Sequence, residues 1–288
     1  FRSEVYLVGL SGRNYFDLRA MQFQVQEDVP DSNPDAINNL QGTALPTFDY
    51  SYTPEEPVLG GELNIDVNSR MINRYTADNE LNIPAIPGIE GNTGRFTAEA
   101  EWKRTIVTDG GFVLTPLFAL QGDANFADMA AASSNGIDAM AGLLNVAADI
   151  RSAYYRYMAT AGLELRWPLL FSSTSATHVL EPMAQIFARP DEPYADKLGL
   201  TNEDSQSFVF DASTLFERDK FAGYDRIEGG TRANLGLRYS STYANGWTSN
   251  AIFGQSYQLA GRNSFNSPDL VNIGVESGLE TAASDYVG

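Results

Sequence analysis

The chain has 288 residues, 43% of them hydrophobic, and a formal net charge of −18 at pH 7. This acidic balance argues against nucleic-acid binding, because phosphate contacts are made by patches of Lys and Arg. The absence of cysteine excludes disulfides, thiolate catalysis and cysteine-based zinc sites.

Alternation of apolar and polar residues predicts about eleven strands. In chain order they cover 2–10, 14–26, 46–53, 60–75, 94–107, 111–125, 154–168, 177–189, 230–243, 247–259 and 270–281. Their connections are alternately short and long from end to end, and the long ones are 27–45, 76–93, 126–153, 190–229 and 260–269. Soluble sandwiches scatter long loops over both ends, whereas outer-membrane barrels keep short turns on one side and long loops on the other. The pattern therefore predicts an all-β, antiparallel transmembrane β-barrel.

The two faces of the expected strands differ in chemistry. Over residues 155–167 one face is apolar with aromatic residues at both ends, and the other carries charges and small residues. Lipid contact needs such an apolar belt between aromatic girdles, while a wet lumen accepts charge. The residues expected to face lipid are Leu163, Leu165, Leu235, Leu237 and Ile273. A large soluble antiparallel sheet with one solvated face stays open as the alternative.

The chain is expected to be an incomplete barrel made of one domain. No Pro/Ser-rich linker or composition shift divides residues 1–288, and no apolar run reaches the roughly 18 residues of a membrane helix. Residues 1–5 begin inside a strand pattern without a signal segment, and eleven is an odd strand number for a bacterial barrel. We expect an internal section whose missing strands lie outside these residues.

Sites of chemistry are sparse in this sequence. His178 is the only histidine, no G-x-S-x-G elbow accompanies it, and it lies in an alternating strand, so we expect a structural role. The acidic run 202–204 lacks the glycine and spaced oxygen ligands of a calcium loop. Paired carboxylates for glycan hydrolysis cannot be singled out among 37 acidic residues. No catalytic residue, cofactor or metal is predicted.

The segment 216–230 interleaves opposite charges with single aromatic residues and glycines. This composition fits a loop that folds inward and pairs its charges, and it also fits a plain surface loop. We favour the first interpretation for the connection 190–229, because it is the longest in the chain. It predicts an ion-pair network in the lumen that includes Arg218, Asp219, Asp225 and Arg226.

Three stretches resemble a known family. The run 216–239, which contains RDKFAGYDRI and NLGLRY, is similar to the most recognisable part of the LPS-assembly proteins of the LptD family, formerly called organic solvent tolerance proteins. HVLEPMAQ at 178–185 and GQSY at 254–257 add to the likeness, and weaker matches at 57–63 and 101–111 extend it over most of the chain. The members it resembles most are alphaproteobacterial.

The resemblance implies a Gram-negative outer-membrane barrel of about 26 strands, within the range such barrels reach, preceded by a periplasmic jelly-roll domain. It implies a plug lipoprotein, LptE, a periplasmic LptA bridge that supplies lipopolysaccharide, and insertion by the barrel assembly machinery. Release to the outer leaflet would use a lateral opening between the first and last strands. By this resemblance, the jelly roll and both seam strands would lie outside these 288 residues.

The function expected from the sequence is therefore that of a conduit and not of an enzyme. Its polar inner face would line a lumen for the sugars and phosphates of lipopolysaccharide, since moving charged groups through hydrocarbon is prohibitive. The alternatives are a passive porin or receptor barrel and, from a different class, an outer-membrane lipase that uses His178 or a secreted glycanase.

Overall fold

The computed structural model describes residues 1–25, 38–80, 85–272, 274 and 277–288. Its main feature is a 12-stranded antiparallel sheet. The long strands are β1 (Arg2–Ser11), β2 (Asn14–Phe23), β3 (Thr43–Tyr52), β4 (Glu62–Arg74), β7 (Gly91–Lys103), β9 (Val113–Met129), β11 (Ala153–Arg166), β13 (Ala176–Ala188), β15 (Thr231–Tyr243) and β16 (Thr248–Ala260). Two short strands, β8 (Ile106–Val107) and β12 (Leu169–Ser172), extend the pairing of β9 and β13.

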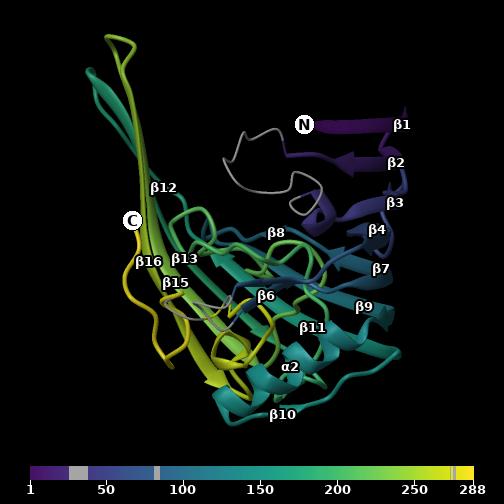
Figure 1. Cartoon of the computed structure of the whole chain (residues 1–288). Coiled ribbons are helices and arrows are strands. Elements are labelled where there is room, and N and C mark those ends of the chain that lie inside the picture. Colours follow the sequence, from purple (N-terminus) through teal and green to yellow (C-terminus); the bar gives the residue numbers. More distant parts are fainter. Residues whose placement is uncertain (26–37, 81–84, 273, 275–276) are drawn as a thin grey trace.

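The long strands follow one another across the sheet in chain order, so each pairs with its neighbours in sequence. The sheet is curved but not closed, and its outermost long strands are β1 and β16 (Figure 1). Within the described part of the chain, no helix is both long enough and apolar enough to cross a membrane. The predicted all-β, antiparallel fold is confirmed.

Short and long connections lie at opposite rims of the sheet. Since successive strands are antiparallel, the turns at 12–13, 53–61, 104–112, 167–175 and 244–247 share one rim, which we call the turn rim. The connections 24–42, 75–90, 130–152 and 189–230 share the other, the loop rim. Gly12 and Gly246 take positive φ angles of 59° and 87° in the tight turns, a conformation that favours glycine.

The loop rim carries small elements of its own. They are β5 (Asp78–Glu80), β6 (Ala85–Gly88), α2 (Ala131–Leu144), β10 (Ala147–Ala148), β14 (Lys197–Leu198) and the 3-10 helix η1 (Ser264–Asn266). β10 pairs with β14 and so joins the connections 130–152 and 189–230. One hydrophobic core joins three of these connections to the segment after β16, through Ile86, Ile137, Leu198 and Leu270. These four segments therefore pack together.

The eleventh predicted strand, 270–281, is wrong for the residues described there, which form turns and bends. Leu270 and Leu279 are buried in the two loop cores, and the Asp269 side chain accepts the Val271 backbone N–H at 2.9 Å. Such local bonds compete with a strand ladder. Further along, Ala283 and Val287 form isolated bridges with β16.

Polar residues are covered and apolar residues are exposed along the central strands, which reverses the order of a soluble protein. In β11, Tyr155 and Tyr157 are 74% and 70% exposed, whereas Arg156 is 3% exposed. The loops lie on the concave side of the sheet (Figure 1), so the covered side chains of each strand face the concave side and the exposed ones face the convex side. Alternation along each strand thus separates an apolar outside from a charged inside.

Candidate functional site

The connection 189–230 lies within the curve of the sheet and pairs its charges with strand residues (Figure 1). At its centre the Asp225 carboxylate binds the guanidinium groups of Arg70 on β4 and Arg95 on β7. Asp204, from the same connection, lies 2.7 Å from Arg95 and 3.6 Å from Arg70. Two carboxylates and two guanidinium groups therefore join the loop to neighbouring strands, in a group that we call the Asp225 cluster.

Backbone donors complete the Asp225 cluster. The Asp225 carboxylate accepts the N–H of Glu203 at 2.6 Å and that of Asp204 at 3.2 Å. Asp204 in turn accepts the N–H groups of Tyr224 and Asp225. The two halves of the connection are thus held to each other at the point where they meet the sheet.

Arg156 on β11 fixes the loop through both its backbone and its side chains. Its Nη1 donates to the Asp225 carbonyl at 2.7 Å, and its Nη2 donates to the Tyr224 carbonyl at 3.0 Å. It forms ion pairs with Asp123 on β9 at 3.1 Å and Glu192 of the loop at 3.0 Å. Its side chain is fully buried.

A second cluster lies at the end of the connection. Glu228, which is fully buried, pairs with Arg232 on β15 at 2.5 Å and with Arg189 at 3.6 Å. Its carboxylate also accepts the backbone N–H of Lys220 at 3.2 Å. The Asp219 carboxylate accepts backbone N–H groups instead, including that of Glu228 at 3.1 Å. We call this group the Glu228 cluster.

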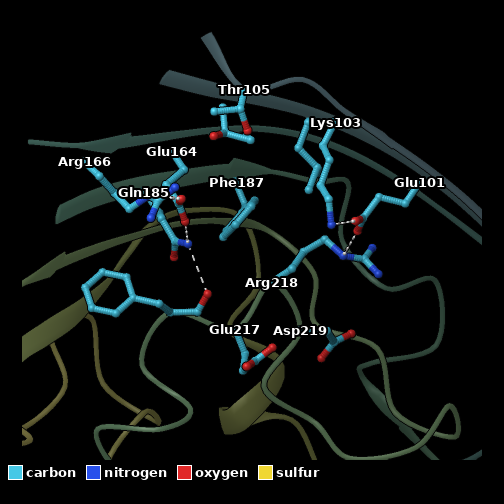
Figure 2. A pocket seen from close by; sticks show the side chains of 13 residues that line it. Glu101, Lys103, Thr105, Glu164, Arg166, Gln185, Phe187, Glu217, Arg218 and Asp219 are labelled. Carbon is cyan, nitrogen blue, oxygen red and sulfur yellow. Dashed lines mark hydrogen bonds and ion pairs between the residues drawn. The ribbon is translucent and has the colours of Figure 1, made fainter. Parts of the chain in front are cut away.

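A cavity of about 510 Å³ lies between the connection and the turn-rim half of the sheet, and Figure 2 shows its charged lining. Arg218 reaches across it to the carboxylates of Glu99 and Glu101 on β7. On the opposite wall, Gln185 donates to Glu164 at 2.6 Å and to a loop carbonyl at 3.1 Å. The cavity can hold polar groups but offers little to hydrocarbon.

The buried loop charges have shifted pKa values. Burial raises the pKa of Asp225, but the attraction of Arg70 and Arg95 outweighs it and holds that pKa below its usual range. Burial, together with the charge of Asp225, raises the pKa of Asp204. Burial also lowers the pKa of Lys220 to about 8, although Glu228 opposes the shift. Each shift follows from the burial of the group and from the charges that surround it.

The four loop residues selected from the sequence have separate partners. Asp225 and Arg218 pair with strand arginines and glutamates, Arg226 lies 3.5 Å from Asp269, and Asp219 caps backbone N–H groups. The strand arginines and Glu228 were not among the residues predicted from the sequence. The arginines could have been found from their position in the sequence, because Arg70, Arg95 and Arg156 lie on the polar faces of alternating strands.

The residues expected to face lipid lie on the outer face where they are described. Leu163, Leu235 and Leu237 are 43%, 49% and 40% exposed, and Leu165 is half-buried. Ile273 lies outside the described residues.

His178 and the acidic run 202–204, considered above for catalysis and for calcium binding, have structural partners. The His178 Nδ1 atom lies 2.8 Å from the Tyr239 hydroxyl, and the two rings stack. In the acidic run, Glu203 pairs with Arg74 and Asp204 with Arg95. Among the residues the structure describes, no group of three or more His, Asp or Glu side chains could hold a metal ion.

An antiparallel sheet with an apolar outer face, a charged inner face and long loops on one rim defines the wall of a transmembrane β-barrel of the outer-membrane type. The family model described as LptD, LPS transport system D, matches residues 1–288, so the chain belongs to the LptD family. A comparison with curated proteins finds no match. Members of this family are outer-membrane proteins of Gram-negative bacteria that transport lipopolysaccharide, and the family is not one of enzymes.

Proposed function

We propose that this chain is the central part of the barrel of a lipopolysaccharide translocon, and that it delivers its cargo to the outer leaflet of the outer membrane. The observation that carries the proposal is the position of the connection 189–230 across the concave face, held by Asp225 and Arg156. In outer-membrane barrels the long loops are extracellular. The packed loops would then close the lumen on the outside, and cargo would have to leave sideways.

The charged inner face suits one part of the cargo. Sugars and phosphates of lipopolysaccharide would pass through the lumen beside groups such as Glu101, Lys103 and Arg166, which line the cavity below the loop. The acyl chains would stay in lipid while the sugars and phosphates stay in water, because moving the charged groups through hydrocarbon would be prohibitively costly.

The partners in this proposal follow from family membership. We propose that LptE plugs the lumen, that an LptA bridge supplies lipopolysaccharide from the periplasm, and that the barrel assembly machinery inserts the protein. The edge of β1 supports pairing with further strands, since an unpaired edge is a template for another strand. The edge of β16 is partly covered by the bridges from Ala283 and Val287. A jelly-roll domain and the seam strands would lie in those further parts of the protein.

The test is Asp225→Ala in the full-length protein. Removing one partner of a buried ion pair costs roughly 3 to 5 kcal/mol, so we expect less assembled barrel and less lipopolysaccharide at the cell surface. The matched control is Asp196→Ala in the same connection, where the carboxylate is 54% exposed and pairs with Arg262 at 3.2 Å; this variant should behave as wild type. Normal surface lipopolysaccharide in the Asp225 variant would contradict the proposed role of the loop.

A further inference from the structure

A groove of about 540 Å³ opens on the convex face of the sheet, where β9, β11 and β13 meet. It belongs to the outer wall and not to the lumen cavity of Figure 2. Most of the residues that line it are apolar, among them Phe118, Leu120, Ala159, Ala161, Ala188 and Pro190, and the buried residues Thr160 and Arg189 also border it.

The groove results from the order of side-chain sizes along β11. The outer face of this strand presents Tyr155 and Tyr157, then the two alanines Ala159 and Ala161, then Leu163. The strand register places Ala161 between Phe118 on β9 and Ala188 on β13, and Ala159 opposite Leu120. Small residues therefore form a floor, and two large side chains of β9 form one wall.

The floor of the groove is held from the lumen side. Arg189, which follows Ala188 directly, donates to the Arg218 carbonyl and lies 3.6 Å from the Glu228 carboxylate. Thr160, between the two floor alanines, is buried under the loop. The groove is thus fixed before any ligand arrives, which lowers the ordering cost of binding.

Aromatic residues place the groove in one leaflet. Tyr155 and Tyr157 mark the loop-rim interface, and the stacked pair Phe112 and Trp167, 4.8 Å between ring centres, marks the turn-rim interface. The floor begins at Ala159, next to Tyr157, and so lies in the leaflet on the loop side. Because long loops are extracellular in such barrels, this is the outer leaflet.

Charge at the loop rim favours an anionic lipid. Arg151, two residues before β11, pairs with Asp149 at 2.8 Å, and Lys197 pairs with the same carboxylate at 3.1 Å. Two partly exposed cations share one carboxylate, so this group of three side chains carries one net positive charge, and the adjacent Asp196, which is 54% exposed, pairs with Arg262. Phosphate groups of a lipid in this leaflet would be attracted there.

We propose that this groove binds an acyl chain of lipopolysaccharide in the outer leaflet, with the lipid phosphates near Arg151 and Lys197. The identity of the lipid rests on the proposed function. The site itself rests on the alanine floor, the wall formed by Phe118 and Leu120, and its position in the apolar belt. It is a binding site on the outer wall, separate from the path through the lumen.

The test uses the purified full-length protein, with its partner lipoprotein, in nanodiscs that contain lipopolysaccharide with a photoreactive group on an acyl chain. Labelled residues are mapped by mass spectrometry. We expect labelling of the groove residues to exceed that of the outer face around Leu235 by about tenfold. A tenfold preference is what burying about two additional methylene groups of the acyl chain in the groove would give.

Ala161→Phe and, independently, Ala188→Phe fill the groove and should remove this excess, whereas Leu235→Phe is the matched control outside it. Uniform labelling of the outer face, or excess labelling that both filling variants leave unchanged, would overturn the proposal. Equal labelling of the groove by a phospholipid with the same photoreactive chain would overturn the choice of lipid. Because nanodiscs need no transport, failure here is distinct from failure of the translocon role, which surface lipopolysaccharide in cells reports.

Discussion

Replacing Arg156 with methionine tests whether the connection 189–230 is locked to the sheet by buried charge. The side chain has no exposed surface, and the two carboxylates that it neutralises, Asp123 and Glu192, are 0% and 2% exposed. Leaving buried carboxylates uncompensated costs roughly 3 to 5 kcal/mol. The carbonyls of Tyr224 and Asp225 also lose their donor, at about 1 kcal/mol each.

We therefore expect Arg156→Met to lower the free energy of unfolding by at least about 4 kcal/mol, measured by urea titration of the full-length protein in detergent micelles. Adding Asp123→Asn and Glu192→Gln removes the stranded charges and should restore most of the loss. Arg238→Met is the control, since that side chain is 47% exposed and 3.6 Å from Glu181. A loss no larger than that of the control, or no recovery in the triple variant, would refute the reasoning.

Three further perturbations give separable outcomes. Leu163→Arg, in the apolar belt, should cost roughly 2 to 4 kcal/mol, while Thr115→Arg, facing the lumen cavity, should be nearly neutral in the same folding assay; equal costs would argue against a lipid-facing outer wall. Burial lowers the pKa of Lys220 from 10.5 to about 8, so its charged form destabilises the folded protein below pH 8, and stability should rise by about 3 kcal/mol between pH 8 and 10.5. A Lys220→Met variant with the same rise would exclude this residue as the cause. Gly223 has a φ of +67° and faces the Asp204 carboxylate, so Gly223→Ala should cost at least about 1 to 2 kcal/mol of unfolding free energy. The control Gly142→Ala, where an added Cβ would meet no neighbouring atom within 4 Å, should be neutral or slightly stabilising, and a neutral result for Gly223→Ala would show that the turn can relax.

Strand alternation was sufficient to predict the faces of the sheet. The period of two residues is local, so the contrast between Tyr157 and Arg156 can be read directly from the sequence. The same signal misled at 270–281, where apolar and polar residues alternate from Val271 onward but Leu270 and Leu279 are buried in cores built from several loops. Such cores depend on contacts between distant segments, which a local pattern does not contain.

The loop motif was visible in the sequence, but its partners were not. Asp225 and Arg70 are 155 residues apart, and Asp225 and Arg95 are 130 apart. Many pairings of 37 acidic with 19 basic residues are compatible with the composition. The curvature of the sheet selects among them, because it brings strands β4 to β15 around one connection (Figure 1).

The most direct test of the central claim asks whether lipopolysaccharide touches the inner face of this wall during export. A photoreactive amino acid is placed in the full-length protein in living cells at Thr115, which lines the lumen cavity, or at Leu114, its neighbour on the outer face near the turn rim. We expect a lipopolysaccharide adduct at Thr115 and none at Leu114, whose surroundings would be the inner leaflet. Absence of the adduct at Thr115 in cells that export normally, or equal adducts at both positions, would contradict a conduit lined by this face.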